Sequence, residues 1–121
     1  MKGKGRKSNP ILLDIVKELR RAAKLNNAPI WDSIAERMKA PRRLMAQVNL
    51  SKINRFSEDG ETILVPGKVL GTGKLDHRVT VAALSFSKEA KRRIEETSGR
   101  CISIKSLIEE NPKGSEVKIL A

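Results

Sequence analysis

Hydrophobic and polar positions change their spacing along this chain near residue 41. From residue 10 onward, apolar side chains recur every three or four positions, which predicts an amphipathic helix. Asn9 before Pro10 is typical of a helix start, and Asn26-Asn27 is typical of a helix end. The apolar arc of this helix consists of Ile11, Ile15, Leu19 and Ala22, bordered by Leu12, Val16 and Ala23.

The opposite arc of the same helix is basic. At 100° per residue, Lys17, Arg20, Arg21 and Lys24 fall together there. We therefore expect this helix to pack with one face and to present a cationic stripe with the other. Leu13 falls inside the basic arc and does not fit this scheme.

A second, shorter helix is predicted for residues 30–39, stopped by Pro41. Trp31 lies on its apolar side, so we interpret Trp31 as a core residue rather than a platform for a nucleic-acid base. Arg42 and Arg43 follow directly after the helix and are expected to be exposed. The apolar side consists of Ile30, Trp31, Ile34, Ala35 and Met38.

After residue 41 the chain alternates short β-type runs with short helical runs, which predicts a mixed α/β fold. The nearly continuous apolar run 79–86 suits a buried central strand. We expect a flexible basic tail at 1–8 and a single domain at 9–121, with a basic helical part (9–47) and an α/β core (48–121). The other predicted strands are 48–50, 62–65, 68–70, 101–103 and 117–120, and the predicted helices are 51–55, capped by Ser51, 88–97, capped by Ser87, and 104–110.

The net charge of +11 is concentrated at one end of the chain. Residues 1–55 contain 14 Lys+Arg against 4 Asp+Glu, whereas residues 56–121 contain 11 against 10. A one-sided positive field of this kind favours a polymer of phosphates as the partner. The sequence therefore predicts nucleic-acid binding by the first half of the chain.

Composition narrows the class of protein further. Aromatic residues make up only 2% of the chain, so recognition of the nucleic-acid backbone and shape is expected rather than stacking on rows of bases. The single cysteine, Cys101, excludes an internal disulfide, and we interpret it as a small buried hydrophobe. No signal peptide or membrane-length apolar run is found, which favours a cytoplasmic protein.

The glycine-rich stretch 67–74 invites a comparison with nucleotide-binding loops, but its spacing fails. A phosphate loop needs glycine five residues before Gly73, and Lys68 stands there; Leu75 stands where Ser or Thr is required. We interpret the glycines as turns between strands. Lys68, Lys74 and Arg78 on these turns are candidates for phosphate contact.

Catalysis and metal binding have little support in the sequence. His77 is the only histidine, and Asp76 beside it would point to the opposite face of an extended segment. His77 is therefore interpreted as a solvated or phosphate-contacting side chain. One histidine and one cysteine cannot complete a zinc site. We predict no enzyme activity, no cofactor, no metal and no small-molecule substrate.

The acidic residues Glu95, Glu96, Glu109 and Glu110 are expected on solvated outer faces of the last two helices.

Five strings of residues resemble the eighteen-e family of large-subunit ribosomal proteins of archaea and eukaryotes. The strings are IAERMKAPRR (34–43), VNLSKINRF (48–56), ILVPGKVLGTGKLDH (63–77), VTVAALSFS (79–87) and ENPKGSEVKI (110–119). The family is similar in fold to the bacterial large-subunit protein fifteen. The length of this chain resembles the archaeal members, because the eukaryotic ones carry longer ends.

The resemblance implies an irregular β-β-α superhelical fold and a structural role in the large ribosomal subunit. It implies contact with large-subunit ribosomal RNA and with neighbouring ribosomal proteins, and no catalysis. Pro41-Arg42-Arg43, Asn49, Lys52, Arg55, Gly67-Lys68 and 71–74 fall on the family's motifs. Combined with the charge pattern, the predicted RNA-binding residues are Lys2, Lys4, Arg6, Lys7, Lys17, Arg20, Arg21, Lys24, Arg42, Arg43, Asn49, Lys52, Arg55, Lys68, Lys74, His77 and Arg78.

Two other classes of function compete with this interpretation. A DNA-binding helix-turn-helix protein would also begin with two helices and a short turn, but its second helix should start with exposed base-reading residues. Here that helix starts Ile30-Trp31-Asp32. An RNA-processing enzyme would need a paired acid and base or a metal cluster, which the chain lacks.

Overall fold

The computed structural model describes residues 10–39 and 45–121, with the side chains of the first segment described from Leu13 onward. Helices and strands alternate through these residues, which is the mixed α/β class that the sequence predicts. The helices are α1 (Pro10–Asn26), α2 (Pro29–Arg37), α3 (Leu50–Phe56), α4 (Lys88–Glu96) and α5 (Ile104–Glu110). The strands are β1 (Ala46–Asn49), β2 (Thr62–Leu70), β3 (Thr80–Phe86), β4 (Arg100–Ser103) and β5 (Val117–Ile119).

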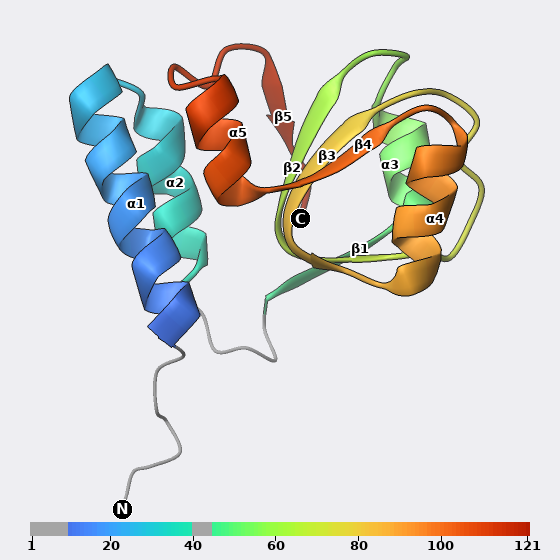
Figure 1. Cartoon of the computed structure of the whole chain (residues 1–121), viewed down its shortest axis with the longest axis horizontal. Helices are drawn as coiled ribbons and strands as arrows, with labels where there is room; N and C mark the ends of the chain where they lie inside the picture. The colour runs from blue at the N-terminus through green and yellow to red at the C-terminus, as the bar shows by residue number, and fades with distance from the viewer. Residues whose placement is uncertain (1–9, 40–44) are drawn as a thin grey trace, which may run out of the picture.

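The strands form one parallel sheet in the order β1-β2-β3-β4, and β5 also pairs with β2 (Figure 1). β1 aligns with the second half of β2, where Ala46 lies opposite Gly67. β5 aligns with the first half, where Val117 lies opposite Thr62. Because β3 occupies the other edge of β2, β1 and β5 share a single edge of this strand.

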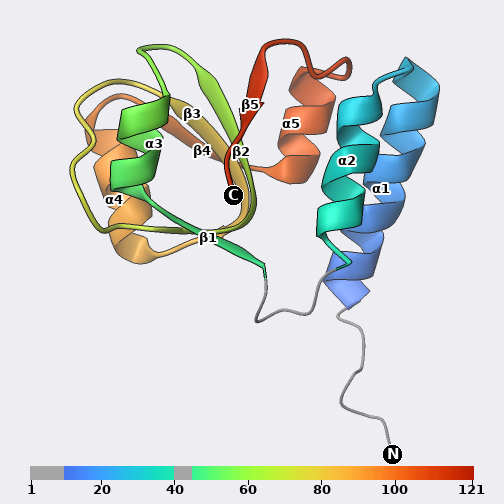
Figure 2. The same ribbon diagram turned by 180° about the vertical axis from the view of Figure 1, so that it is seen from behind.

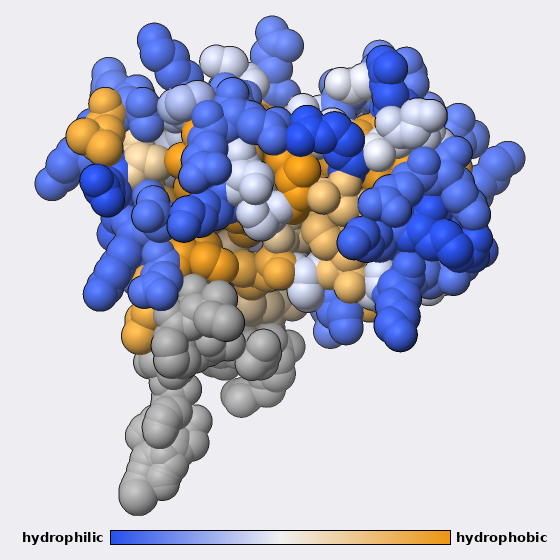
Figure 3. Space-filling view, viewed as in Figure 1, coloured by the Kyte–Doolittle hydropathy of each residue, from blue (hydrophilic) through white to orange (hydrophobic). Residues whose placement is uncertain are grey.

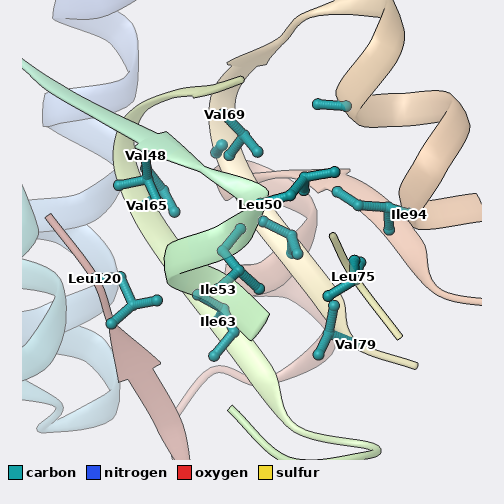
Figure 4. Packing of buried hydrophobic residues seen from close by; sticks show 13 residues of the cluster. Val48, Leu50, Ile53, Ile63, Val65, Val69, Leu75, Val79, Ile94 and Leu120 are labelled. Atoms are coloured by element: carbon teal, nitrogen blue, oxygen red, sulfur yellow. The ribbon is translucent and has the colours of Figure 1, made fainter. Parts of the chain in front are cut away.

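Hydrophobic side chains on the two faces of the sheet form two separate clusters. We call them the α3/α4 core, shown in Figure 4, and the α1/α2/α5 core, after the helices that cover each face. Ile63 and Val65 of β2 belong to the α3/α4 core, whereas Leu64 between them belongs to the α1/α2/α5 core. Successive residues of a strand point to opposite faces, so β2 contributes to both cores.

The helices α1 and α2 lie side by side, at the other end of the molecule from α3 and α4 (Figures 1 and 2). Asn27 adopts the left-handed conformation (φ 50°) between them, as expected for a helix end. Trp31 is fully buried, and its indole Nε1 donates a hydrogen bond to the carbonyl oxygen of Pro112 at 2.7 Å. This confirms that Trp31 is a core residue. Leu13, which did not fit the helical pattern, is 48% exposed.

The sequence prediction of two strands at 62–65 and 68–70 is wrong, because a single strand, β2, runs through Pro66-Gly67. Proline lacks the N–H that a ladder needs, and the pairing of β2 with β3 shifts between Val65 and Lys68, where that donor is missing. Gly67 passes so close to β1 that a Cβ there would lie 2.0 Å from the carbonyl oxygen of Ala46. Proline and glycine therefore shape this strand rather than end it.

Two predicted helix starts also need correction. Leu50 is the first residue of α3 rather than the end of a strand, and Asn49, not Ser51, occupies the N-cap position. Leu50 is fully buried against the sheet, and this packing fixes the start of a helix that has no side-chain cap. The second helix, predicted to begin at residue 30, begins one residue earlier, because Pro29 is the first residue of α2. Ser87 caps α4 as predicted, accepting a hydrogen bond from the backbone N–H of Ala90.

No helix in the described ranges is long and apolar enough to cross a membrane. The division into a tail at 1–8 and one domain at 9–121 stays a prediction, and residues 1–8 lie outside the described part of the chain.

Candidate nucleic-acid interface

The exposed side of α1 carries three of the predicted RNA-binding cations. Lys17, Arg21 and Lys24 are exposed, and none of them forms an ion pair within the described part of the chain. Their spacing of three and four residues places them on one side of a helix, as the periodicity predicts. These three side chains are therefore unpaired cations on the surface of the helix.

Arg20, the fourth predicted cation of this helix, turns toward α2. Its guanidinium pairs with the carboxylates of Glu36 at 2.9 Å and of Asp32 at 3.5 Å. The hydrogen bond from Arg20, together with one from Lys39, holds the pKa of Glu36 below its ordinary value. A phosphate contact by Arg20 stays a prediction, and such a contact would have to compete with these two carboxylates.

A second group of predicted residues lies on α3. Leu50 and Ile53 bury one side of this helix in the α3/α4 core, which leaves Lys52 and Arg55 on its outer side. The Lys52 ammonium donates a hydrogen bond to the carbonyl oxygen of Ala121. The Arg55 guanidinium lies 5.6 Å from the ring centroid of its neighbour Phe56. Asn49 lies half-buried at the N-cap position and makes no side-chain capping bond.

Lys68 stands on the sheet itself. The pairing of β1 with β2 and of β2 with β3 places Gln47, Lys68 and Ser85 in one row across three strands, and all three are exposed. A bare polar row on a parallel sheet is unusual, because both faces of such sheets are normally covered. Lys68 therefore presents its charge on an open part of the sheet near the carboxyl ends of the strands.

The connection between β2 and β3 is pressed against two helix starts. A Cβ on Gly71 would lie 2.6 Å from the Glu89 side chain at the start of α4, and one on Gly73 would lie 2.5 Å from Ser51 at the start of α3. Gly73 also has φ 99°. These glycines allow the close approach, and Lys74, the next residue, is exposed.

His77 lies in a hydrogen-bonded chain, which corrects its interpretation as a solvated side chain. Its Nε2 lies 2.8 Å from Ser57 Oγ and its Nδ1 lies 3.1 Å from Asp76 Oδ1, and the ring is only 16% exposed. The expectation that Asp76 and His77 would point apart is wrong, because this segment is a loop and not a strand. The hydrogen bond from His77 holds the pKa of Asp76 below its ordinary value.

The chain Ser57–His77–Asp76 has the residue types of a hydrolase triad but not its proton arrangement. Ser57 is buried, and its hydroxyl donates to the carbonyl oxygen of Ile53. Because that carbonyl accepts the single hydroxyl hydrogen, the hydroxyl has no hydrogen left to give to His77 Nε2. The imidazole therefore does not act as a base on this hydroxyl in the observed arrangement. The chain instead ties the end of α3 to the β2–β3 loop.

Arg78, the last predicted residue of this loop, lies near Asp59, with 3.6 Å between its guanidinium and the carboxylate. Both side chains are more than half exposed. Exposed pairs of this kind contribute little and can exchange for a phosphate.

The three arginines of α4 and β4 are paired with carboxylates, whereas Lys88 and Lys91 of α4 form no ion pair with a described residue. Arg92 and Arg93 of α4 both bind Glu89, and Arg100 binds Glu110 of α5. These hydrogen bonds hold the pKa values of Glu89, first through Arg93, and of Glu110 below their ordinary values. The end of the molecule formed by α4 is strongly hydrophilic (Figure 3), and the charges of its arginines are compensated by carboxylates.

Several predicted residues cannot be placed in this geometry. They lie outside the described ranges and are Lys2, Lys4, Arg6, Lys7, Arg42 and Arg43. Within the described ranges, no three His, Cys, Asp or Glu side chains come close enough to hold a metal ion.

The sequence of this chain is similar to known proteins along its whole length. The family described as "Ribosomal protein 60S L18 and 50S L18e" matches residues 1–121. The chain belongs to this ribosomal protein family. The large ribosomal subunit protein eL18 of Methanospirillum hungatei is 50% identical over 114 residues, which is 94% of each chain. The eL18 protein of Archaeoglobus fulgidus is 48% identical over 115 residues, covering 95% of this chain and 98% of that one. Membership of the eL18 family identifies the protein as a ribosomal component and not as an enzyme.

Proposed function

We propose that this protein is a structural constituent of the large ribosomal subunit that binds and stabilises large-subunit ribosomal RNA through Lys and Arg contacts to phosphates. The observation that carries the proposal is a set of exposed cations on α1, α3, β2 and the β2–β3 connection that form no ion pair with a described residue. Lys17, Arg21, Lys24, Arg55, Lys68 and Lys74 are exposed and form no ion pair within the described residues. Phosphates are the natural partners of such a surface.

The paired cations lie elsewhere. Arg92, Arg93 and Arg100 already bind carboxylates of α4 and α5, so the arginines at this end of the molecule are less available to RNA. This end of the molecule is therefore available to neighbouring ribosomal proteins. The protein would work in the cytoplasm as part of the ribosome, without a cofactor, and residues 1–8 would add phosphate contacts. We also propose that the fold is an irregular β-β-α superhelix and that it is related to the fold of the bacterial large-subunit protein fifteen.

A DNA-binding helix-turn-helix role is less well supported. In that motif the second helix enters the major groove with its first residues exposed. Here Trp31 is buried at the start of α2, and Asp32 beside it is an anion that pairs with Arg20. The start of α2 therefore lacks the exposed Arg, Asn or Gln side chains that commonly read base edges.

Sucrose-gradient sedimentation of source-cell lysate tests the proposal. We expect stoichiometric co-sedimentation with the large subunit at low salt and release near molar salt, since each phosphate contact contributes roughly 0.7–0.9 to the salt slope of log K. Recovery in the soluble fractions at low salt would contradict the proposal.

Matched charge variants then locate the contacts. Lys68→Gln with Lys74→Gln should weaken binding to purified large-subunit ribosomal RNA and lower the salt slope by about 1.4–1.8. Lys88→Gln with Lys91→Gln removes the same charge from α4, where both lysines are also exposed, and should leave the slope unchanged. Equal effects of the two pairs would mean that net charge, and not this surface, determines binding.

A further inference from the structure

A groove of about 500 Å³ between α1 and α5 brings together charges that are distant in the sequence. Lys17 and Arg21 line it from α1, and Lys105 lines it from α5. The half-buried side chains of Ile15 and Ile108 form its apolar part. Within the described residues none of the three cations forms an ion pair, so three unpaired positive charges face one concave surface.

Two carboxylates line the same groove. Asp14 and Glu18 lie on α1, three residues before Lys17 and Arg21 respectively, a spacing at which helix side chains often pair. Neither carboxylate forms an ion pair with a described residue. The groove therefore offers hydrogen-bond donors from its cations and hydrogen-bond acceptors from its carboxylates. A site that binds only phosphates would not contain the carboxylates, since carboxylates repel phosphates.

We propose that this groove binds a strand of RNA. The phosphates of the RNA contact Lys17, Arg21 and Lys105, and hydrogen-bond donor groups of the RNA contact Asp14 and Glu18. The inference rests on the proposed function and extends it by assigning a site. The donors are ribose 2′-hydroxyls and exocyclic amino groups, which the shallow minor groove of RNA displays beside the phosphates. The isoleucines supply the apolar surface for the sugars.

This arrangement distinguishes RNA from DNA. The 2′-hydroxyl is the donor that DNA lacks, and hydrogen bonds to a charged acceptor are about twice as strong as neutral ones. The carboxylates thus give selectivity, whereas the three cations give affinity for either nucleic acid. Simple electrostatics predicts the opposite role for the carboxylates, which would then only weaken binding.

The experiment compares two forms of one probe. The nuclease-protected fragment of large-subunit ribosomal RNA is recovered from its complex with the full chain and is then synthesised with ribose and with deoxyribose. Filter binding gives the ratio of the two Kd values. We expect the wild-type protein to prefer ribose by about tenfold or more, and Asp14→Asn with Glu18→Gln to reduce this ratio to below about threefold.

Lysine variants test the other half of the site. Lys105→Gln should weaken binding to both probes and lower the salt slope by roughly 0.7–0.9. Lys91→Gln, which removes an exposed charge from α4 instead, should change neither quantity. Circular dichroism of each variant shows that the fold is retained, because the substituted side chains are on the surface.

Three results would overturn the inference while leaving the proposed function in place. The first is tighter RNA binding by Asp14→Asn with Glu18→Gln at an unchanged ratio, which would mean that the carboxylates only repel. The second is a Lys105→Gln variant that behaves like Lys91→Gln. The third is a Lys105→Gln variant that loses a protein neighbour in the subunit while its RNA affinity is unchanged. A wild-type protein with no affinity for large-subunit ribosomal RNA would overturn the proposed function itself.

Discussion

Replacing Ile94 by alanine tests whether the two hydrophobic cores unfold as one unit. Ile94 of α4 is fully buried in the α3/α4 core. Trp31, the only tryptophan, is fully buried in the α1/α2/α5 core on the other face of the sheet. The two residues thus belong to different clusters, and any effect of Ile94 on Trp31 has to pass through the sheet.

The structure sets the size of the expected effect. Truncating a fully buried isoleucine to alanine costs about 2–5 kcal/mol, because burial is lost and a cavity remains. With a urea m-value of about 2 kcal/mol per molar, a loss of about 3 kcal/mol lowers the unfolding midpoint by about 1.5 M. Since Ile63, Leu64 and Val65 of β2 point alternately into both cores, neither core can lose its strand alone.

The assay follows urea unfolding by Trp31 fluorescence and by far-ultraviolet circular dichroism. We expect both midpoints to fall together in Ile94→Ala, since coincident transitions are the mark of a single cooperative unit. Leu25→Ala, at a side chain that is 72% exposed, is the control and should shift the midpoint little. A fluorescence midpoint that stays at the wild-type value while the dichroism midpoint falls would refute the argument and the single-domain prediction with it.

Three other perturbations have definite expected outcomes. Gly67→Ala would force a Cβ to within 2.0 Å of the Ala46 carbonyl oxygen, so a loss of at least about 1–3 kcal/mol in urea unfolding is expected; wild-type stability would show that β1 can move aside. Ser87→Ala should cost about 1 kcal/mol as a lost cap, whereas Ser51→Ala, with no capping bond, should cost much less. Burial raises the pKa of the Cys101 thiol to about 11, so iodoacetamide should alkylate the native protein at pH 9 at least about tenfold more slowly than the urea-unfolded protein, and equal rates would contradict this.

The helical part of the fold could be predicted well because its signals are local. The period of α1, the left-handed Asn27 and the buried side of α2 with Trp31 all follow from positions within a few turns of each other. The cap at Ser87 is equally local. In these segments, the sequence therefore predicts both the type of each secondary-structure element and its position.

The errors occur where distant contacts override a local signal. Pro66-Gly67 is typical of a turn, yet β1 and β3 hold it within a strand. Ser51 is a good capping residue, yet the burial of Leu50 starts α3 one residue earlier. In both cases the deciding partner lies far away in the chain, which no local pattern reveals.

In the candidate interface, too, some features follow from local sequence patterns and others depend on distant contacts. Periodicity places the cations of α1 correctly on one side of the helix, but it does not reveal that Arg20 is engaged by Glu36 of the next helix. Lys105, which we add to the proposed interface, was not among the predicted residues, because it lies in the half of the chain whose charges balance. Only the packing of α5 beside α1 brings it next to Lys17. Its exposed position on a short helix, opposite the buried Ile104 and Leu107, was the one available signal.

The division of one edge of β2 between β1 and β5 has a consequence for the order of folding. β5 pairs with residues more than 50 positions earlier in the chain, so this contact closes late and at a high entropic cost. Until β5 arrives, the first half of β2 presents unpaired backbone groups and the apolar side chains of an open strand edge. Such edges are templates for association with other chains. A nascent chain is therefore vulnerable to aggregation during the interval between synthesis of β2 and synthesis of β5.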